Sequence, residues 1–226
     1  MNPIILDNIP CVLDTQKIAK RLHVEPDTDD YADLQKLLKQ VMEIAKPKAV
    51  YKPVFIEERG SDFVMLDNQR MVSTVLQQNL KDVHRAFAYV STCGEEIEAW
   101  SKSVTDMLHN WWMDGIKEHV LACASVYLKA RVVSDMELGK IASMSPGSLP
   151  DWPITEQAKL FALIGDSQEM VGVSLTDSML MTPAKTVSGV IFETEHDYVS
   201  CQLCTREKCV GRKVPFDEKK YTELLG

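Results

Sequence analysis

The sequence predicts an α+β fold, with a helix-rich N-terminal part that also carries an antiparallel sheet and with a sheet-rich C-terminal segment. The longest signal is almost continuous helical periodicity across 95–135, where apolar side chains recur three and four residues apart. Strand-like stretches gather toward the end of the chain, separated by Pro183 and by the turn 194–197. Because helices and strands do not alternate regularly, this layout favours segregated elements over a βαβ fold.

The N-terminal elements follow from apolar spacing and from residues that cap or break helices. Asp29 and Asp30 can cap a helix whose apolar residues keep helical spacing until Pro47 ends it. The expected elements are, in order, a strand over 3–7, helices over 15–22 and 29–46, strands over 49–57 and 63–66 joined by the turn 59–62, a helix over 71–80 and a strand over 85–91.

The remaining elements follow the long helical region, which is one helix or two helices broken near Asn110. A loop over 143–153 precedes a helix over 154–164, with Asp151 or Thr155 near its start and Gly165 as its C-cap. Strands are expected over 177–181, 186–193 and 198–203. No linker rich in Pro, Gly or Ser divides the chain, so we expect one unit over 1–226 whose motif-bearing part is 143–212.

Charge and composition exclude several classes of protein. The net charge of −8, from 33 acidic and 25 basic side chains, argues against a polyanion-binding surface, so no nucleic acid partner is expected. No signal-like leader and no run of about 20 apolar residues is present, which predicts a cytoplasmic protein that does not contact membranes. Six cysteines are too few for a disulfide-dense scaffold, and Cys11, Cys93 and Cys123 are expected to be buried small residues.

The strongest chemical motif is C-x2-C-x4-C at Cys201, Cys204 and Cys209. Thiolates within about ten residues can bind one zinc ion or one iron–sulfur cluster, but three ligands are one short of four. The fourth ligand can come from another cysteine, from His196, from a substrate or from a partner. Four basic side chains in the same stretch favour thiolate, and hence metal binding or redox reactivity: Arg206, Lys208, Arg212 and Lys213. Structurally silent cysteines remain the alternative.

Two loops have ligand-binding character. In the segment Ser145-Pro146-Gly147-Ser148, proline fixes φ and glycine lets a ligand approach the backbone, although an ordinary loop before a helix has the same composition. Lys185, in the junction after Pro183, can meet a carboxylate or be solvated at a strand edge. No G-x-G-x-x-G follows a strand, which argues against a Rossmann-type nucleotide site.

A longer pattern surrounds these loops. Its elements are Ser145-Pro146-Gly147, Asp151, Glu156-Gln157, Gly172, Leu175-Thr176, Ser178, Met181, Pro183 and Val187-Ser188-Gly189. In this pattern the chain resembles the activation domain of cobalamin-dependent methionine synthase, which binds S-adenosylmethionine (AdoMet). With its cysteine-containing tail, it is similar to the stand-alone proteins of that family.

Two positions depart from the family pattern. Ser143 and Ser148 stand where the family has an arginine that reaches the AdoMet carboxylate and a tyrosine that follows the glycine. Lys140 or Lys185 can replace the lost cation.

The resemblance implies an accessory protein for reductive reactivation, which returns cob(II)alamin to the methylated state by one-electron reduction and methyl transfer from AdoMet. Backbone groups at Ser145, Pro146, Gly147 and Ser148 would bind the cofactor AdoMet, with Lys185 and Tyr198 beside it. The cobalamin would come from the partner, a cobalamin-dependent methionine synthase or another corrinoid protein, and electrons from a low-potential donor. No catalytic side chain is expected, because the sulfonium is already a good leaving group and cobalt is the nucleophile.

Two other functions stay open at this point. The cysteines are compatible with a metal or iron–sulfur electron-transfer module that reduces a corrinoid protein without AdoMet. They are equally compatible with a non-catalytic binding protein that holds a structural zinc ion.

Overall fold

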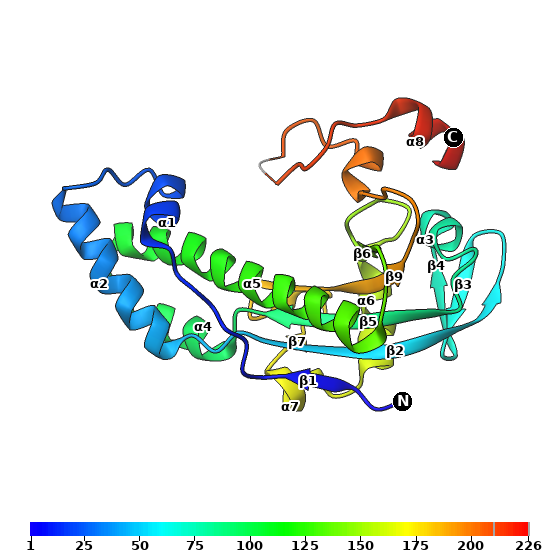
Figure 1. Cartoon of the computed structure of the whole chain (residues 1–226), viewed down its shortest axis with the longest axis horizontal. Coiled ribbons are helices and arrows are strands. Elements are labelled where there is room, and N and C mark those ends of the chain that lie inside the picture. Colours follow the sequence, from blue (N-terminus) through cyan, green and yellow to red (C-terminus); the bar gives the residue numbers. More distant parts are fainter. Residues whose placement is uncertain (210, 226) are drawn as a thin grey trace.

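The main feature of the molecule is an antiparallel sheet, seen in the computed structural model, which describes residues 1–209 and 211–225 (Figure 1). Its strand order is β4-β3-β2-β5-β9-β6, and β1 pairs with the first part of β2. Every pairing in it is antiparallel. The strands are β1 (Ile4–Leu6), β2 (Lys48–Arg59), β3 (Phe63–Leu66), β4 (Gln69–Val72), β5 (Arg85–Thr92), β6 (Ile141–Met144) and β9 (Thr186–Glu193).

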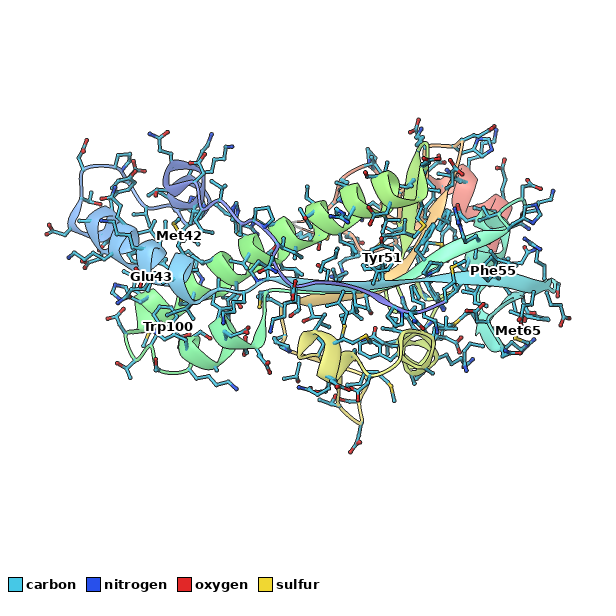
Figure 2. All side chains as sticks on the ribbon, turned by 60° about the horizontal axis from the view of Figure 1, so that its bottom comes forward. Met42, Glu43, Tyr51, Phe55, Met65 and Trp100 are labelled. Atoms are coloured by element: carbon cyan, nitrogen blue, oxygen red, sulfur yellow. The ribbon has the colours of Figure 1, made fainter. Side chains whose placement is uncertain are left out.

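One face of the sheet is covered by α5 (Met107–Met136), which crosses it as the long green helix of Figure 1. Successive side chains of a strand point to opposite faces, so Tyr51, Phe87 and Ile191 all pack beneath this helix. The hydroxyl group of Tyr51, labelled in Figure 2, donates to Oδ2 of Asp135 on α5 at 2.6 Å. Burial of these aromatic and aliphatic side chains holds the long helix on the sheet.

The opposite face is covered by short helices and by the C-terminal segment. Val90, Val190 and Phe192 point this way and pack with Trp152 and Leu160 in a second core. The elements of this layer are α3 (Thr74–Asn79), the 3-10 helix η1 (Ile154–Glu156), α6 (Gln157–Ile164), α7 (Ser167–Val171), the pair β7 (Ser174–Leu175) and β8 (Met181–Thr182), the 3-10 helix η2 (Ser200–Leu203) and α8 (Glu218–Leu225).

A third core lies beyond the end of the sheet. There α1 (Thr15–Arg21), α2 (Asp29–Ile44) and α4 (Glu95–Ser101) pack against the first half of α5 (Figure 1). Its centre is formed by Trp112, Ile97 and Leu34, all buried. Met42 and Trp100 mark this end of the molecule in Figure 2.

The α+β class and the antiparallel sheet are confirmed, and most predicted elements match observed ones. The expected helix over 71–80 is wrong at its start, because Met71 belongs to β4 and the side chain of Ser73 caps α3. The N-cap of α2 is Thr28, whose Oγ1 accepts the backbone N–H of Tyr31 at 3.2 Å. The helical region 95–135 breaks before Asp106, which caps α5, and not near Asn110.

The C-terminal predictions are less accurate. The expected strand over 198–203 is wrong, because residues 200–203 form the 3-10 helix η2. The ring of Tyr198 packs at a tilt against that of Phe192. The strand expected over 177–181 is replaced by a turn between β7 and β8. β6, α7 and α8 were not predicted, since each is short and lacks a long periodic pattern.

Candidate ligand-binding site

A pocket of about 250 Å³ lies where the loop after β6 meets the first residues of α6 and β9. It opens to solvent, and its wall combines backbone-rich loop residues with a few polar side chains. The residues that line it are Ser145, Pro146, Gly147, Ser148, Ile154, Gln157, Met181, Thr186, Val187 and Ser188. The four loop residues that the sequence singles out therefore lie on one wall, facing polar groups from two other elements.

The loop on this wall has a fixed shape. Gly147 has φ of +79°, in the left-handed region that favours glycine, and a Cβ there would lie 2.9 Å from Cδ1 of Ile154. The backbone N–H of Gly147 donates to the carbonyl of Trp152 at 2.7 Å, and the N–H of Ser148 donates to that of Ser145 at 3.1 Å. Because Leu149 and Trp152 are buried, the loop is anchored in the core on the far side of the pocket.

Asp151 ties the same loop to α3. Its carboxylate accepts the backbone N–H groups of Thr74 at 3.1 Å and Val75 at 3.0 Å, and also the hydroxyl of Ser73. These bonds satisfy donors that the first turn of a helix leaves unpaired. The helix start therefore holds the loop, and the loop in turn caps the helix.

Gly189 lets the loop approach β9. A Cβ on Gly189 would lie 2.2 Å from the carbonyl oxygen of Met144 and 2.8 Å from Oγ of Ser145. Opposite, the buried Gln157 accepts the hydroxyl of Ser188 at 3.4 Å and donates from Nε2 to the carbonyl of Met179 at 3.2 Å. The pocket wall is thus built from hydrogen bonds between three segments distant in sequence.

A row of hydroxyl groups runs from the pocket wall to α5. Burial raises the pKa of Tyr89 on β5, while hydrogen bonds with Ser145 and Ser143 oppose this shift. Nζ of Lys129 donates to Oγ of Ser143 at 3.2 Å. Sequence reasoning missed Tyr89 and Lys129, because the pairing of β5, β9 and β6 brings Tyr89 near Ser143 and Ser145, and the packing of α5 on the sheet brings Lys129 there.

The comparisons with known proteins agree with this geometry. The family model described as vitamin B12 dependent methionine synthase, activation domain, matches residues 143–212. A solved structure of the MetH reactivation domain bound to AdoHcy aligns with a TM-score of 0.59 at 16% sequence identity, covering 88% of this chain and 81% of that chain. The chain resembles the methionine synthase activation domain. No curated protein matches the sequence significantly.

The structure places the other predicted ligand residues outside the pocket. Lys185 is not on the pocket wall: its Nζ pairs with Oδ2 of Asp114 at 2.9 Å, although the next residue, Thr186, lines the pocket. Lys140, considered above as a substitute cation, pairs with Asp197.

Tyr198 lies after the end of β9, in the segment that leads to η2. Its ring packs 6.4 Å from that of Phe192, which is four residues, or about 13 Å of extended strand, beyond Ser188 of the pocket. Burial raises the pKa of Tyr198 to about 12, and its hydroxyl oxygen accepts the hydroxyl of Ser200 at 3.3 Å. In this arrangement Tyr198 anchors the C-terminal segment and does not line the pocket.

The three tail cysteines surround an arginine. The guanidinium of Arg212 donates to the carbonyls of Cys201 at 3.1 Å and Cys204 at 3.3 Å, and to that of Arg206. Cys209 is exposed. Across residues 1–209 and 211–225, no group of three or more Cys, His, Asp or Glu side chains is placed to hold a metal ion. The described geometry therefore gives the zinc and iron–sulfur hypotheses no convergent ligand set.

Proposed function

We propose that the chain is an accessory protein that presents AdoMet to a corrinoid protein for reductive reactivation. The observation that carries the proposal is the pocket at Ser145–Ser148, which falls inside the segment matched by the activation-domain model. The aligned reactivation domain was solved with AdoHcy, the thioether that AdoMet becomes when it loses its methyl group. A site for one molecule suits the other, because they differ only at sulfur.

The reaction balances without a proton donor or acceptor from this chain. One electron from a low-potential donor reduces cob(II)alamin, the substrate carried by the partner, to cob(I)alamin. The cobalt electron pair attacks the methyl carbon of AdoMet, the C–S bond breaks, and AdoHcy leaves with the bonding pair. Methyl transfer then removes the reduced species and draws an unfavourable reduction forward.

The chain's contribution to this reaction is position. The open pocket lets one side of the ligand face a docked partner, while the rigid loop and Gln157 fix the other side. Holding a methyl group in line with its nucleophile lowers the entropic part of the barrier.

No helix in the described part of the chain is long and apolar enough to cross a membrane.

Calorimetry with AdoMet and AdoHcy tests the proposal, and two glycines provide matched variants. Gly147 and Gly165 both have positive φ, so alanine strains the backbone at either position, but only Gly147 lines the pocket. We expect Gly147→Ala to weaken AdoMet binding at least tenfold and Gly165→Ala to leave it unchanged.

A second measurement tests the partner. We expect methylcobalamin to be regenerated when the wild-type protein is mixed with a corrinoid methyltransferase, AdoMet and a low-potential reductant. The absorbance of methylcobalamin measures the reaction. Absence of AdoMet binding at millimolar concentration, with and without the corrinoid protein, rejects the proposed function.

A further inference from the structure

Lys129 is a half-buried cation for which the described structure provides no carboxylate. It sits on α5, and its only hydrogen bond is the 3.2 Å contact to Oγ of Ser143. Burial lowers the pKa of Lys129, and the positive charge of Lys213 lowers it further. A desolvated ammonium group held by one hydroxyl is in an unfavourable state that a bound anion would relieve.

The other half-buried lysines have stronger hydrogen-bond partners than Lys129 has. Four of them contact a carboxylate within 3 Å, namely Lys48, Lys117, Lys159 and Lys185. Lys52 and Lys220 donate to amide oxygens at 2.7 and 2.9 Å. Among the half-buried lysines that the structure describes, Lys129 has the weakest partner, in a chain whose net charge of −8 supplies abundant carboxylates.

The position of Lys129 links it to the pocket. Ser143, the partner of Lys129, stands two residues before Ser145, which lines the pocket, and both serines are near enough to the Tyr89 phenol to oppose the rise of its pKa. We propose that Lys129, with the hydroxyls of Ser143 and Tyr89, forms a subsite for the carboxylate of the amino-acid part of AdoMet. This subsite rests on the proposed function. In this subsite, Lys129 on α5 supplies the positive charge that an arginine supplies in the family pattern, at the position of Ser143.

The test compares AdoMet with decarboxylated AdoMet, which lacks only the carboxylate, by calorimetry on the full chain. Wild type should prefer AdoMet by about tenfold or more, as expected for a charged hydrogen bond. Lys129→Met should abolish the preference, and Lys220→Met, which removes a half-buried lysine of the tail, should keep it. Because Lys129 is desolvated, Lys129→Met should melt no lower than wild type, which separates ligand binding from misfolding.

Each result is decisive. If wild type binds neither nucleoside, the proposed function fails and the subsite fails with it. If wild type binds AdoMet but Lys129→Met keeps the full preference for the carboxylate, the subsite alone is wrong.

A second and independent observation concerns Cys11 and Cys123. Their sulfur atoms lie 2.8 Å apart, with the Cys11 thiol donating, although 112 residues separate them in sequence. Cys123 belongs to α5, while Cys11 belongs to the segment that leads from β1 to α1. Burial raises the pKa of Cys11, and the hydrogen bond with Cys123 adds to this shift; since this disfavours the reactive thiolate, the short distance between the sulfur atoms is what points to a disulfide. An S–S bond of about 2.05 Å needs only a small further approach.

Cys11 is also accessible, and Cys123 is half-buried. A pocket of about 150 Å³, lined by Cys11, Leu13, Met42 and Val120 among others, reaches the Cys11 side chain. We infer that Cys11 and Cys123 are a redox modification site that forms a disulfide with a peroxide as oxidant. Peroxide converts one thiol to a sulfenic acid and releases water; the second thiol then attacks that sulfur and releases a second water.

Peroxide treatment of the full chain tests this inference, read by mass spectrometry of non-reduced peptides. We expect a cross-link between the peptides of Cys11 and Cys123, reversed by a dithiol and absent in Cys123→Ser. A variant with serine at positions 201, 204 and 209 should retain the cross-link. If peroxide oxidises the tail thiols of the wild-type chain and no cross-link between the Cys11 and Cys123 peptides forms, the inferred disulfide is wrong.

Discussion

The pocket loop and the cysteine tail carry the two strongest motifs of the sequence, yet they differ in how the fold uses them. Ser145–Ser148 meets side chains from α6 and β9 around a shared cavity. In the tail, Cys201 and Cys204 direct their carbonyls to one guanidinium, that of Arg212, and Cys209 is exposed. The loop therefore forms a cavity with distant segments, whereas the hydrogen bonds around the cysteines stay within the tail, which is held on the core by apolar residues such as Leu203.

This difference separates two kinds of sequence signal. Gly147 and Gly189 record backbone approaches that only glycine permits, so their positions already contain information about three-dimensional contacts. Cysteine spacing records only that thiols are near one another along the chain, and the direction of each side chain decides whether they meet. Four variants and their controls can break or sharpen this comparison.

The largest effect is expected from Gly189→Val. Its Cβ would lie 2.2 Å from the carbonyl of Met144, so β6 and the pocket loop must move away from β9. We expect a loss of about 3 kcal/mol of unfolding free energy, measured by urea denaturation, together with loss of AdoMet binding. Gly211→Ala is the control in the tail, because a Cβ there meets nothing within 4 Å. If both variants lower the unfolding free energy and the AdoMet affinity equally, the close contact of β9 with the pocket loop is not what maintains the pocket.

A smaller effect is expected from removing the cap that joins the loop to α3. Asp151→Ala leaves the N–H groups of Thr74 and Val75 without an acceptor and should cost about 1–2 kcal/mol, with weaker AdoMet binding. Asp217→Ala removes the matching cap of α8, where the carboxylate accepts the N–H of Lys220 at 3.0 Å. That variant should loosen the tail, measured by hydrogen exchange, and leave AdoMet affinity unchanged; a change in affinity would show that the tail supports the pocket.

The sequence predicted the elements whose signals are local. The strands over 63–66 and 186–193 and the helix over 154–164 coincide closely with β3, β9 and η1 with α6. Alternation, apolar periodicity and caps act over a few residues, so they can be read without knowing the fold. β4 was missed because its four residues run directly into the apolar residues of α3, and the two patterns overlap.

The site was only partly predictable for a related reason. Ser145–Ser148 is continuous in sequence and carries its own turn chemistry, so it could be found. Tyr89 could not, because strand register sets its distance from the loop, and register is a property of the whole sheet. Lys129 could not either, because its contact with Ser143 depends on how α5 crosses the sheet. Tyr198 was placed beside the ligand by resemblance alone, and its position on Phe192 depends on how the tail folds back.

The tail cysteines provide the third test, with a smaller expected effect. Serine at positions 201, 204 and 209 should leave AdoMet affinity unchanged and lower stability by less than about 1 kcal/mol, because Cys209 is exposed and the other two are only half-buried. Protein purified without oxygen should be colourless and contain no stoichiometric zinc or iron by elemental analysis. Stoichiometric metal that the serine variant loses would instead show that the cysteines converge in solution, and would favour the electron-transfer or structural-zinc function.

The smallest effect concerns the anchor of the tail. Burial raises the pKa of Tyr198 to about 12, from about 10 in an unfolded chain, and the Asp151 carboxylate adds to the shift. A raised pKa means that the folded state favours the neutral phenol. Its stabilising contribution is therefore complete below about pH 10 and is lost as pH rises toward about 12.

The phenylalanine of Tyr198→Phe cannot ionise, so the variant should lose less unfolding free energy than wild type between pH 9 and 11.5. At pH 8 the variant should be less stable than wild type by up to about 1 kcal/mol, because it lacks the hydrogen bond from Ser200. Urea denaturation at these pH values measures both terms, and the buried Tyr51 and Tyr89 are common to both proteins. AdoMet affinity at pH 8 should be the same in both, since Tyr198 packs on Phe192, which lies about 13 Å along β9 from Ser188. If the variant instead binds AdoMet tenfold more weakly while its tail stays ordered by hydrogen exchange, Tyr198 reaches the ligand and the division between loop and tail is wrong.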